Sequence, residues 1–334
     1  MSQLLKMKII HVNEVSFVAD GLVSALKKRN TDVRFESLYD MRDKVSLPTS
    51  YIKRAWRALK LQFKYKDVDI WHVHFMGNAL FFLLSTKKLV VHLHGSDIRP
   101  PLSLKNRIVK NIIFRRADSI LYSTPDIKAY VDTFSEKALY LPNIISEEVL
   151  TTPLRQSSDS VKSVFFFAVP NLIKGGDIGL KALEGLKSIY PSLKISVFGF
   201  GQCFESRYAD KFETLDRMRR GDVLKKVLDS DLVLGQLRVG AIGMSELEVL
   251  GLGKPLVTYF KYGEVYQSLM PIYNVSSAEQ VIEVMDGVIK EWSEDQENTL
   301  SLERRKWVIE NHSERVVLDI LLGNYVKILG MDKN

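Results

Sequence analysis

Short runs of β-branched and aromatic residues alternate with helix-like stretches along the chain, and this alternation constrains the fold more than any other feature. Residues 70–75 (IWHVHF), 89–94 (LVVHLH) and 193–198 are examples of the strand-like runs. Successive strands in such a pattern run parallel, because each helical crossover carries the chain back to the edge of the sheet from which it started. The sequence therefore predicts an α/β fold in which helices cover parallel sheets.

A polar, turn-forming stretch between residues 146 and 163 interrupts the alternation, which then restarts. A chain of 334 residues is also longer than one hydrophobic core usually serves. We therefore predict two doubly wound, Rossmann-like domains facing a cleft, the first over residues 1–155 and the second over residues 156–312. Residues 313–334 are predicted to form a C-terminal helix that packs back toward the first domain.

The net charge of +7 is concentrated in the first half of the chain. Residues 1–150 hold 24 basic and 15 acidic side chains, a net charge of +9, so the remaining residues carry −2. This asymmetry suggests an anionic partner for the first half: a membrane surface, a phosphorylated acceptor or nucleic acid. No nucleic-acid-binding motif is recognisable, so we do not expect nucleic acid as a partner.

The cysteine content and the hydropathy of the chain indicate its cellular compartment. The single cysteine, Cys203, excludes an internal disulfide and suits a reducing compartment. The first residues lack the long apolar core of a signal peptide, and no apolar run is as long as a membrane span. We therefore expect a cytoplasmic protein that meets a membrane, if at all, peripherally on its inner face.

A basic, aromatic stretch at residues 48–66 (PTSYIKRAWRALKLQFKYK) is the candidate for that contact. From residue 44 to residue 66 there are seven basic side chains and no acidic one, and Ile52, Trp56 and Phe63 recur at helical spacing. A basic helix with an aromatic apolar face can lie on an anionic membrane surface. The alternative is an ordinary amphipathic helix that packs on its own domain.

A glycine-rich loop leads from a predicted strand into a predicted helix after residue 233. The free N–H groups and the dipole of a helix start favour phosphate, and glycines let a ligand approach the backbone. Glu248 lies about one turn into the helix, where a carboxylate can accept hydrogen bonds from two hydroxyls of a ribose. The alternative is a strand–helix unit in which Glu248 is only solvated. The loop contacts to the ligand are expected from Gly240, Ala241, Ile242, Gly243 and Met244.

Three other sites carry candidate residues. Lys174, followed by two glycines (NLIKGGD), fits a lysine that reaches a diphosphate from a loop before a helix, although a solvated loop lysine is the alternative. His94 ends an apolar strand and could hydrogen-bond a sugar or place a proton; the alternative is a structural histidine. His72 and His74 face one side of a strand, as a metal pair would, but the sequence shows no third ligand at useful spacing.

Taken together, these motifs resemble a known family. HGSD (94–97), KGG (174–176), VFGFG (197–201) and the pattern GxxG-x4-E-x4-GKP (240–255) follow one another in an order that resembles the retaining glycosyltransferases of family 4, which have the GT-B fold. The resemblance covers nearly the whole chain, and it implies that residues 1–155 form the acceptor-side domain and residues 156–312 form the nucleotide-sugar donor domain. It implies transfer of a sugar from a nucleotide-sugar donor to a glycan or lipid-linked acceptor, with retention of configuration and without a metal or other cofactor.

The resemblance also assigns roles to individual residues. Glu248 matches the second glutamate of the family's E-x7-E motif, which holds the nucleotide ribose, and Lys174 matches its diphosphate lysine. His94 matches the histidine near the transferred sugar, and Gly243 matches the loop glycine near the backbone donors. The glycines that follow a strand of the donor domain are matched by Gly199 and Gly201.

Three features depart from the family pattern, and one is the lack of a glycine-rich N-terminal loop, because residues 11–17 (HVNEVSF) contain no glycine. Gly240 stands where the first glutamate of E-x7-E is expected. The arginine that usually accompanies the lysine is missing, and Arg238 is our candidate to replace it as an anion-binding group. From the resemblance we expect a hexosyltransferase-like, nucleotide-sugar-dependent enzyme. The departures favour the alternative, a non-catalytic relative of the same fold that binds a glycan or a nucleotide.

Overall fold

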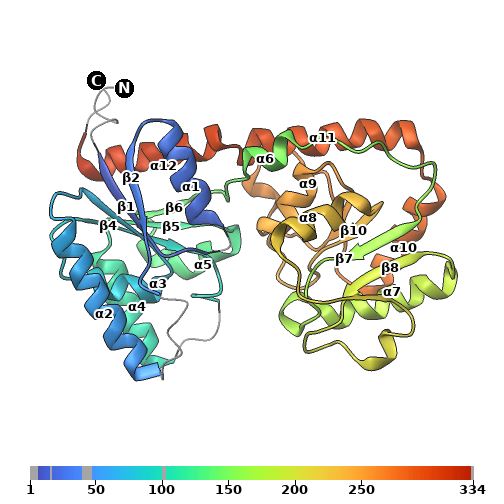
Figure 1. The fold of residues 1–334 in the computed structure, drawn as a ribbon, viewed down its shortest axis with the longest axis horizontal. Coiled ribbons are helices and arrows are strands. Elements are labelled where there is room, and N and C mark those ends of the chain that lie inside the picture. Colours follow the sequence, from blue (N-terminus) through green and yellow to red (C-terminus); the bar gives the residue numbers. More distant parts are fainter. Residues whose placement is uncertain (1–6, 16, 40–46, 100–102, 332–334) are drawn as a thin grey trace. The chain divides into compact units, whose positions relative to one another are not determined.

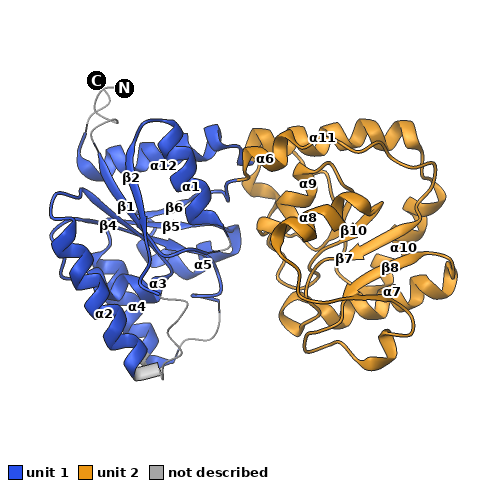
Figure 2. Cartoon of the chain, in the orientation of Figure 1, with its two compact units in different colours: residues 1–144, 312–334 blue, residues 145–311 orange. Residues whose placement is uncertain are grey.

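The computed structural model of the protein describes residues 7–15, 17–39, 47–99 and 103–331 and forms two compact units (Figure 1). Unit 1 contains the chain up to residue 144 and from residue 312 onward, and unit 2 contains residues 145–311 (Figure 2). Lys44, the first of the seven basic side chains counted between residues 44 and 66, lies outside the described residues. No helix among the described residues is both long enough and apolar enough to span a membrane.

Unit 1 is built on a parallel six-stranded sheet with the strand order β2-β1-β3-β4-β5-β6. The strand order reverses between β1 and β3, and such a switch point is where doubly wound sheets bind ligands. The strands are β1 (Lys8–Val12), β2 (Asp32–Glu36), β3 (Ile70–His74), β4 (Lys88–Leu93), β5 (Ser119–Tyr122) and β6 (Ala138–Tyr140). The α-helices are α1 (Val18–Lys28), α2 (Leu47–Lys64), α3 (Met76–Ala79), α4 (Leu104–Arg116), α5 (Lys128–Val131) and α12 (Glu314–Leu329).

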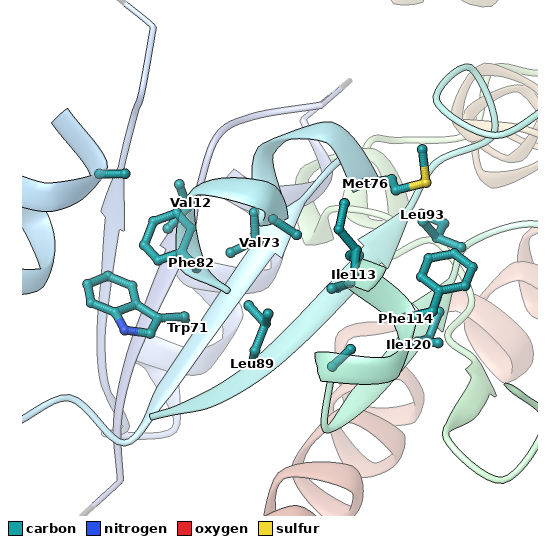
Figure 3. Packing of buried hydrophobic residues seen from close by; sticks show 14 of the residues in the cluster. Val12, Trp71, Val73, Met76, Phe82, Leu89, Leu93, Ile113, Phe114 and Ile120 are labelled. Carbon is teal, nitrogen blue, oxygen red and sulfur yellow. The ribbon is translucent and has the colours of Figure 1, made fainter. Parts of the chain in front are cut away.

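The strands of unit 1 present two different faces. Side chains at alternating positions, among them Trp71 and Val73 of β3 and Leu89 of β4, pack against Phe82 and Phe114 in an apolar core (Figure 3). Successive strand residues point to opposite faces. The residues between them in sequence, which include most of the histidines of the chain, therefore belong to the other face of the sheet.

Unit 2 repeats this architecture with the strand order β12-β11-β10-β7-β8-β9, also parallel throughout. Its strand order reverses between β7 and β10. The strands are β7 (Ser163–Phe166), β8 (Lys194–Phe198), β9 (Glu213–Leu215), β10 (Leu232–Leu234), β11 (Leu256–Thr258) and β12 (Tyr273–Asn274). The α-helices are α6 (Glu147–Thr151), α7 (Gly176–Ile189), α8 (Arg220–Asp229), α9 (Met244–Gly251), α10 (Ala278–Lys290) and α11 (Glu294–His312).

The two units divide between residues 144 and 145, upstream of the boundary at 155/156 that the polar stretch indicates. The short helix α6 belongs to unit 2, where Val149 lies against Gly251 at the end of α9. The C-terminal helix α12 belongs to unit 1. There Glu314 pairs with Lys28 at the end of α1 (2.8 Å), and Asp319 pairs with Arg29 (2.8 Å).

Candidate functional site

The loops that carry most of the predicted site residues follow three neighbouring strands of unit 2. They leave the carboxyl ends of β7, β10 and β8, and β7 and β10 flank the switch point of the sheet. The loops are joined by backbone hydrogen bonds, because the Leu237 N–H donates to the Lys174 carbonyl (2.8 Å) and the Cys203 N–H donates to the Pro170 carbonyl (2.9 Å). The structure therefore brings the lysine loop, the glycine-rich loop and the loop after β8 together at one edge.

Gln236, buried directly after β10, holds the glycine-rich loop in its conformation. Its amide nitrogen donates to the carbonyls of Ala241 (3.0 Å) and Tyr259 (2.9 Å), and its amide oxygen accepts from the N–H groups of Val239 (2.8 Å) and Arg238 (3.2 Å). The sequence analysis missed this residue. Its signal, a polar side chain immediately after a buried strand, is also found in many ordinary loops.

Two glycines of the site have backbone conformations that favour glycine. Gly240 has a φ of 72°, and a Cβ there would lie 2.9 Å from the ring of Tyr259. Gly201 has a φ of 119°, and a Cβ there would lie 2.5 Å from the Pro170 carbonyl oxygen. Side chains are strained in this left-handed region. The absence of a glutamate at position 240 therefore has a local physical reason.

The remaining loop residues contribute through their backbone. Ala241 and Ile242 are buried, so their side chains pack within unit 2. Gly243 precedes α9, and its N–H donates to the carboxylate of Glu246 (3.2 Å). The first N–H groups of any helix lack partners within it, so the amides of Met244 and the next residue are the donors that α9 offers to an anion.

Glu248 is a buried carboxylate with a fixed cationic partner, Arg220 at the start of α8. The Arg220 Nε donates to Glu248 Oε1 at 2.7 Å, and its guanidinium also forms a close ion pair with this oxygen. Burial raises the pKa of Glu248, although the charge and hydrogen bond of Arg220 oppose the shift. The predicted alternative of a solvated Glu248 is therefore wrong. Arg220 lies 28 residues upstream, and nothing in the sequence connects the two.

The predicted cationic residues have different surroundings. Lys174 is exposed. Its backbone N–H donates to the side-chain Oδ1 of Asn171 (2.9 Å), which fixes the conformation of the loop. Arg238, the candidate replacement for the missing arginine, pairs with Asp177 in the first turn of α7 (2.7 Å). An anion would have to compete with this carboxylate for Arg238. Gly199 is exposed at the end of β8.

His94 lies in unit 1, directly after β4, whereas the other predicted site residues lie in unit 2. It is half-buried, and the backbone N–H groups of His94 and Gly95 donate to Asp97 Oδ1 at 3.1 and 3.0 Å. Asp97 also lines a pocket of about 560 Å³ in unit 1. The other lining residues include Tyr39, which follows β2, and residues of α2 and α4. A strand-end histidine beside such a pocket can contact a polar ligand.

Comparisons with known proteins identify the fold. The sequence matches no protein-family model and no curated protein. Among solved structures, the HepE protein of Anabaena, in complex with UDP and glucose, is 13% identical, with a TM-score of 0.67 over 95% of this chain and 98% of that chain. Sucrose-phosphate synthase from Thermosynechococcus elongatus is 12% identical, with a TM-score of 0.70 over 98% of this chain and 100% of that chain.

A third similar structure is the catalytic domain of starch synthase IV from Arabidopsis thaliana, bound to ADP and acarbose. It is 10% identical, with a TM-score of 0.70 over 97% of this chain and 99% of that chain. At these identities the likeness establishes the fold. The chain has the GT-B fold of these glycosyltransferases, with two Rossmann-like domains, and the predicted fold class is confirmed.

Proposed function

We propose that the protein is a retaining glycosyltransferase that uses a nucleotide-sugar donor without a metal. The observation that carries this proposal is the joined set of loops at the β7/β10 switch point of unit 2, where Lys174, the start of α9 and the buried Glu248 lie at one edge. A diphosphate and a ribose need just such a combination of a cation, free N–H groups and a fixed carboxylate.

In this proposal Lys174 and the first amides of α9 bind the diphosphate, and Glu248 accepts hydrogen bonds from the ribose hydroxyls. Arg220 binds Oε1 of Glu248, so Oε2 is the oxygen that turns to the ribose. Groups fixed in this way stabilise the negative charge that develops on the leaving diphosphate as the sugar–phosphate bond breaks. They supply that stabilisation without a divalent ion in the donor site.

The acceptor side of the proposal rests on unit 1. His94 contacts the transferred sugar, and the pocket lined by Asp97 and Tyr39 takes part of a glycan or lipid-linked acceptor. A phosphate oxygen of the leaving group, rather than a protein base, takes the proton of the acceptor hydroxyl. Retention of configuration follows if this oxygen and the acceptor act on the same face of the sugar.

The test is turnover of UDP-, ADP- and GDP-linked sugars by the purified protein in the presence of a chelator, measured as release of the nucleoside diphosphate. We expect one donor to be consumed, and we expect Lys174→Ala and Glu248→Gln each to lower the rate. Lys181→Ala on α7 is the matched control, because Lys181 is an exposed lysine that pairs with Glu279. Unchanged turnover in both site variants would refute the assigned donor site.

A non-catalytic glycan- or nucleotide-binding protein is the second candidate. The observation in its favour is Gly240, because its φ of 72° is unfavourable for the glutamate expected at that position. Calorimetric binding of a nucleoside diphosphate without donor consumption, over a broad panel of donors and acceptors, would favour this candidate over the enzyme.

We further propose that unit 1 binds an anionic membrane surface, which would make a lipid-linked acceptor accessible. Ala58 and Leu61 of α2 are buried, whereas Ile52, Trp56 and Phe63 remain 58% to 70% exposed. A second helix adds to this surface: α4 exposes apolar residues at four-residue spacing, each between 49% and 76% exposed, and they are Leu104, Ile108 and Ile112. Residues of α2 and α4 line one pocket, so the two helices lie side by side.

Sedimentation with vesicles that contain anionic lipid tests this surface. We expect binding at low salt, weaker binding at high salt, and loss of binding in Trp56→Glu combined with Lys53→Glu. Ile189→Glu combined with Lys181→Glu makes the same change of charge and also replaces an exposed apolar residue on α7 of unit 2, and it should leave binding intact. Failure of the wild-type protein to bind at low salt would refute the membrane surface and leave the donor site untouched.

A further inference from the structure

Five of the six histidines form one chain of hydrogen bonds in unit 1, on the face of the sheet opposite the apolar core; four of them are buried and His94 is half-buried. They come from β1, β3 and β4, and the phenol of Tyr325 on α12 completes the chain. The order of the groups is His94, His74, His11, Tyr325, His72 and His92. The successive contacts are 3.0, 3.1, 3.2, 2.5 and 3.1 Å.

Strand register explains why these histidines meet. His11 is the register partner of His72, and His74 is the register partner of His92. Because alternate residues of a strand share a face, the H-x-H pairs of β3 and β4 place their rings side by side. The sequence shows His72 and His74 as an incomplete metal pair, and the structure adds neighbours from the adjacent strands.

The two ends of the chain of hydrogen bonds lie close together. His74, His92 and His94 each offer a ring nitrogen, and these three nitrogens lie within 4.8 Å of one another. The Nε2 of His92 is buried and has no hydrogen-bond partner among the residues that the structure describes. A tetrahedral ion with bonds of about 2.0–2.1 Å holds its nitrogens about 3.4 Å apart, so a small shift of these rings would complete the site.

The chemistry of the three rings selects a class of ion. All three donors are imidazole nitrogens, and metals bind imidazole in its neutral form. Neutral imidazole nitrogens suit zinc and its transition-metal neighbours, whereas magnesium and calcium prefer oxygen.

The far nitrogens of two of these rings are already bound, which is the usual arrangement around a metal. The Nε2 of His74 is hydrogen-bonded to His11, and the Nδ1 of His92 is hydrogen-bonded to His72. We propose that His74, His92 and His94 bind one divalent transition-metal ion of the zinc class in unit 1. This site goes beyond the proposed function, in which the donor phosphates are bound in unit 2 without a metal.

Proton counting along the chain shows how the hydrogen bonds rearrange when the ion binds. Each neutral imidazole has one N–H and one lone pair. If His74 and His92 both turn lone pairs to the ion, their other nitrogens donate inward, and His11 and His72 then both donate to the oxygen of Tyr325. The phenol keeps its own proton, because burial raises the pKa of Tyr325 well above its ordinary value. The Tyr325 oxygen is therefore the shared acceptor at the centre of the metal-bound chain.

Calorimetric titration of the chelator-treated, full-length protein with Zn²⁺ tests the site. We expect one ion per chain. His92→Gln and His94→Gln should weaken binding strongly, and His72→Gln should weaken it about 10- to 100-fold by removing the partner of a ligand. His312→Gln is the matched control, because His312 is buried in unit 1 but bonds to the Asn143 carbonyl, outside the chain of histidines.

Tyr325→Phe removes the acceptor that His11 and His72 share, so it should weaken Zn²⁺ binding although Tyr325 contacts no ligand of the ion. X-ray absorption of the zinc-bound wild-type protein counts the imidazole ligands directly and does not depend on how well the variants fold. Three imidazoles would support the site. Failure of the wild-type protein to bind Zn²⁺, or binding that His92→Gln leaves unchanged, would overturn it.

Discussion

We expect mild acid to unfold unit 1 selectively in metal-free protein. Burial, aided in three of the four rings by the other histidines, lowers the pKa of His11, His72, His74 and His92, and that of His11 falls to about 3. In the unfolded chain the same side chains titrate near the ordinary histidine pKa of 6.5. The unfolded state therefore binds more protons below that pH, so stability is complete above about pH 6.5 and is lost as the pH falls toward the folded-state pKa values.

The size of the effect follows from the number of buried rings. At about pH 5.5, one unit below the unfolded-state pKa, each ring that stays neutral in the folded state costs about 1.4 kcal/mol of stability. Four fully buried rings together cost about 6 kcal/mol, which is comparable to the total stability of a typical domain, about 5–15 kcal/mol. All six histidines belong to unit 1, so unit 2 lacks this source of acid sensitivity.

Hydrogen exchange measured by mass spectrometry at about pH 7.5 and about pH 5.5, corrected for the intrinsic exchange rate, provides the assay. We expect peptides from β3 and β4 to lose protection at the lower pH and peptides from β7 and β10 to keep theirs. A chelator must be present, because a bound ion would hold the imidazoles in place. Equal protection of β3 and β4 at the two pH values would refute the reasoning.

Three substitutions in unit 2 test the geometry of the donor loops. Gly240→Ala should cost about 1–2 kcal/mol, seen as a lower unfolding midpoint, because its φ is positive. Gly287→Ala, inside α10 where a Cβ meets open space, should instead raise stability by about 0.5–1 kcal/mol. Gln236→Leu removes four hydrogen bonds and should cost about 2–4 kcal/mol in chemical unfolding, with faster hydrogen exchange in the loop that follows. Arg220→Met leaves Glu248 buried and unpaired. This substitution should lower the free energy of unfolding by about 2–3 kcal/mol near pH 8 and by less near pH 5, because a raised carboxyl pKa favours the folded state only while the carboxyl is protonated. An equal cost at both pH values would contradict the pairing of Arg220 with Glu248.

Much of the fold could be predicted from the sequence, because alternating strands and helices leave few topologies open to a chain of this length. The apolar pattern of α2 was less decisive. Ile52, Trp56 and Phe63 recur at helical spacing, but so do Ala58, Leu61 and Tyr65, and the structure buries the second set. Periodicity detects an apolar stripe, but it does not say which of two stripes faces the core.

The candidate site divides in a similar way. Its glycines and Lys174 stand beside strand ends, where local sequence marks them. Local sequence does not mark the partners of its charged groups, because Arg220 lies 28 residues from Glu248 and Asp177 lies 61 residues from Arg238. Pairings of that kind depend on how helices pack on the sheet, and one sequence carries no local signal for them. The same holds for Tyr325, which meets His11 across 314 residues.

That last contact has a consequence for the order in which the protein matures during synthesis. Unit 2 is one continuous segment, so it can fold as soon as residue 311 has left the ribosome. Unit 1 begins first but needs α12, and until Tyr325 emerges the histidine face of its sheet lacks its final partner. The first strands to be made are thus the last to be completed, and a nascent chain that stalls near its end would present exposed imidazoles to chaperones and proteases.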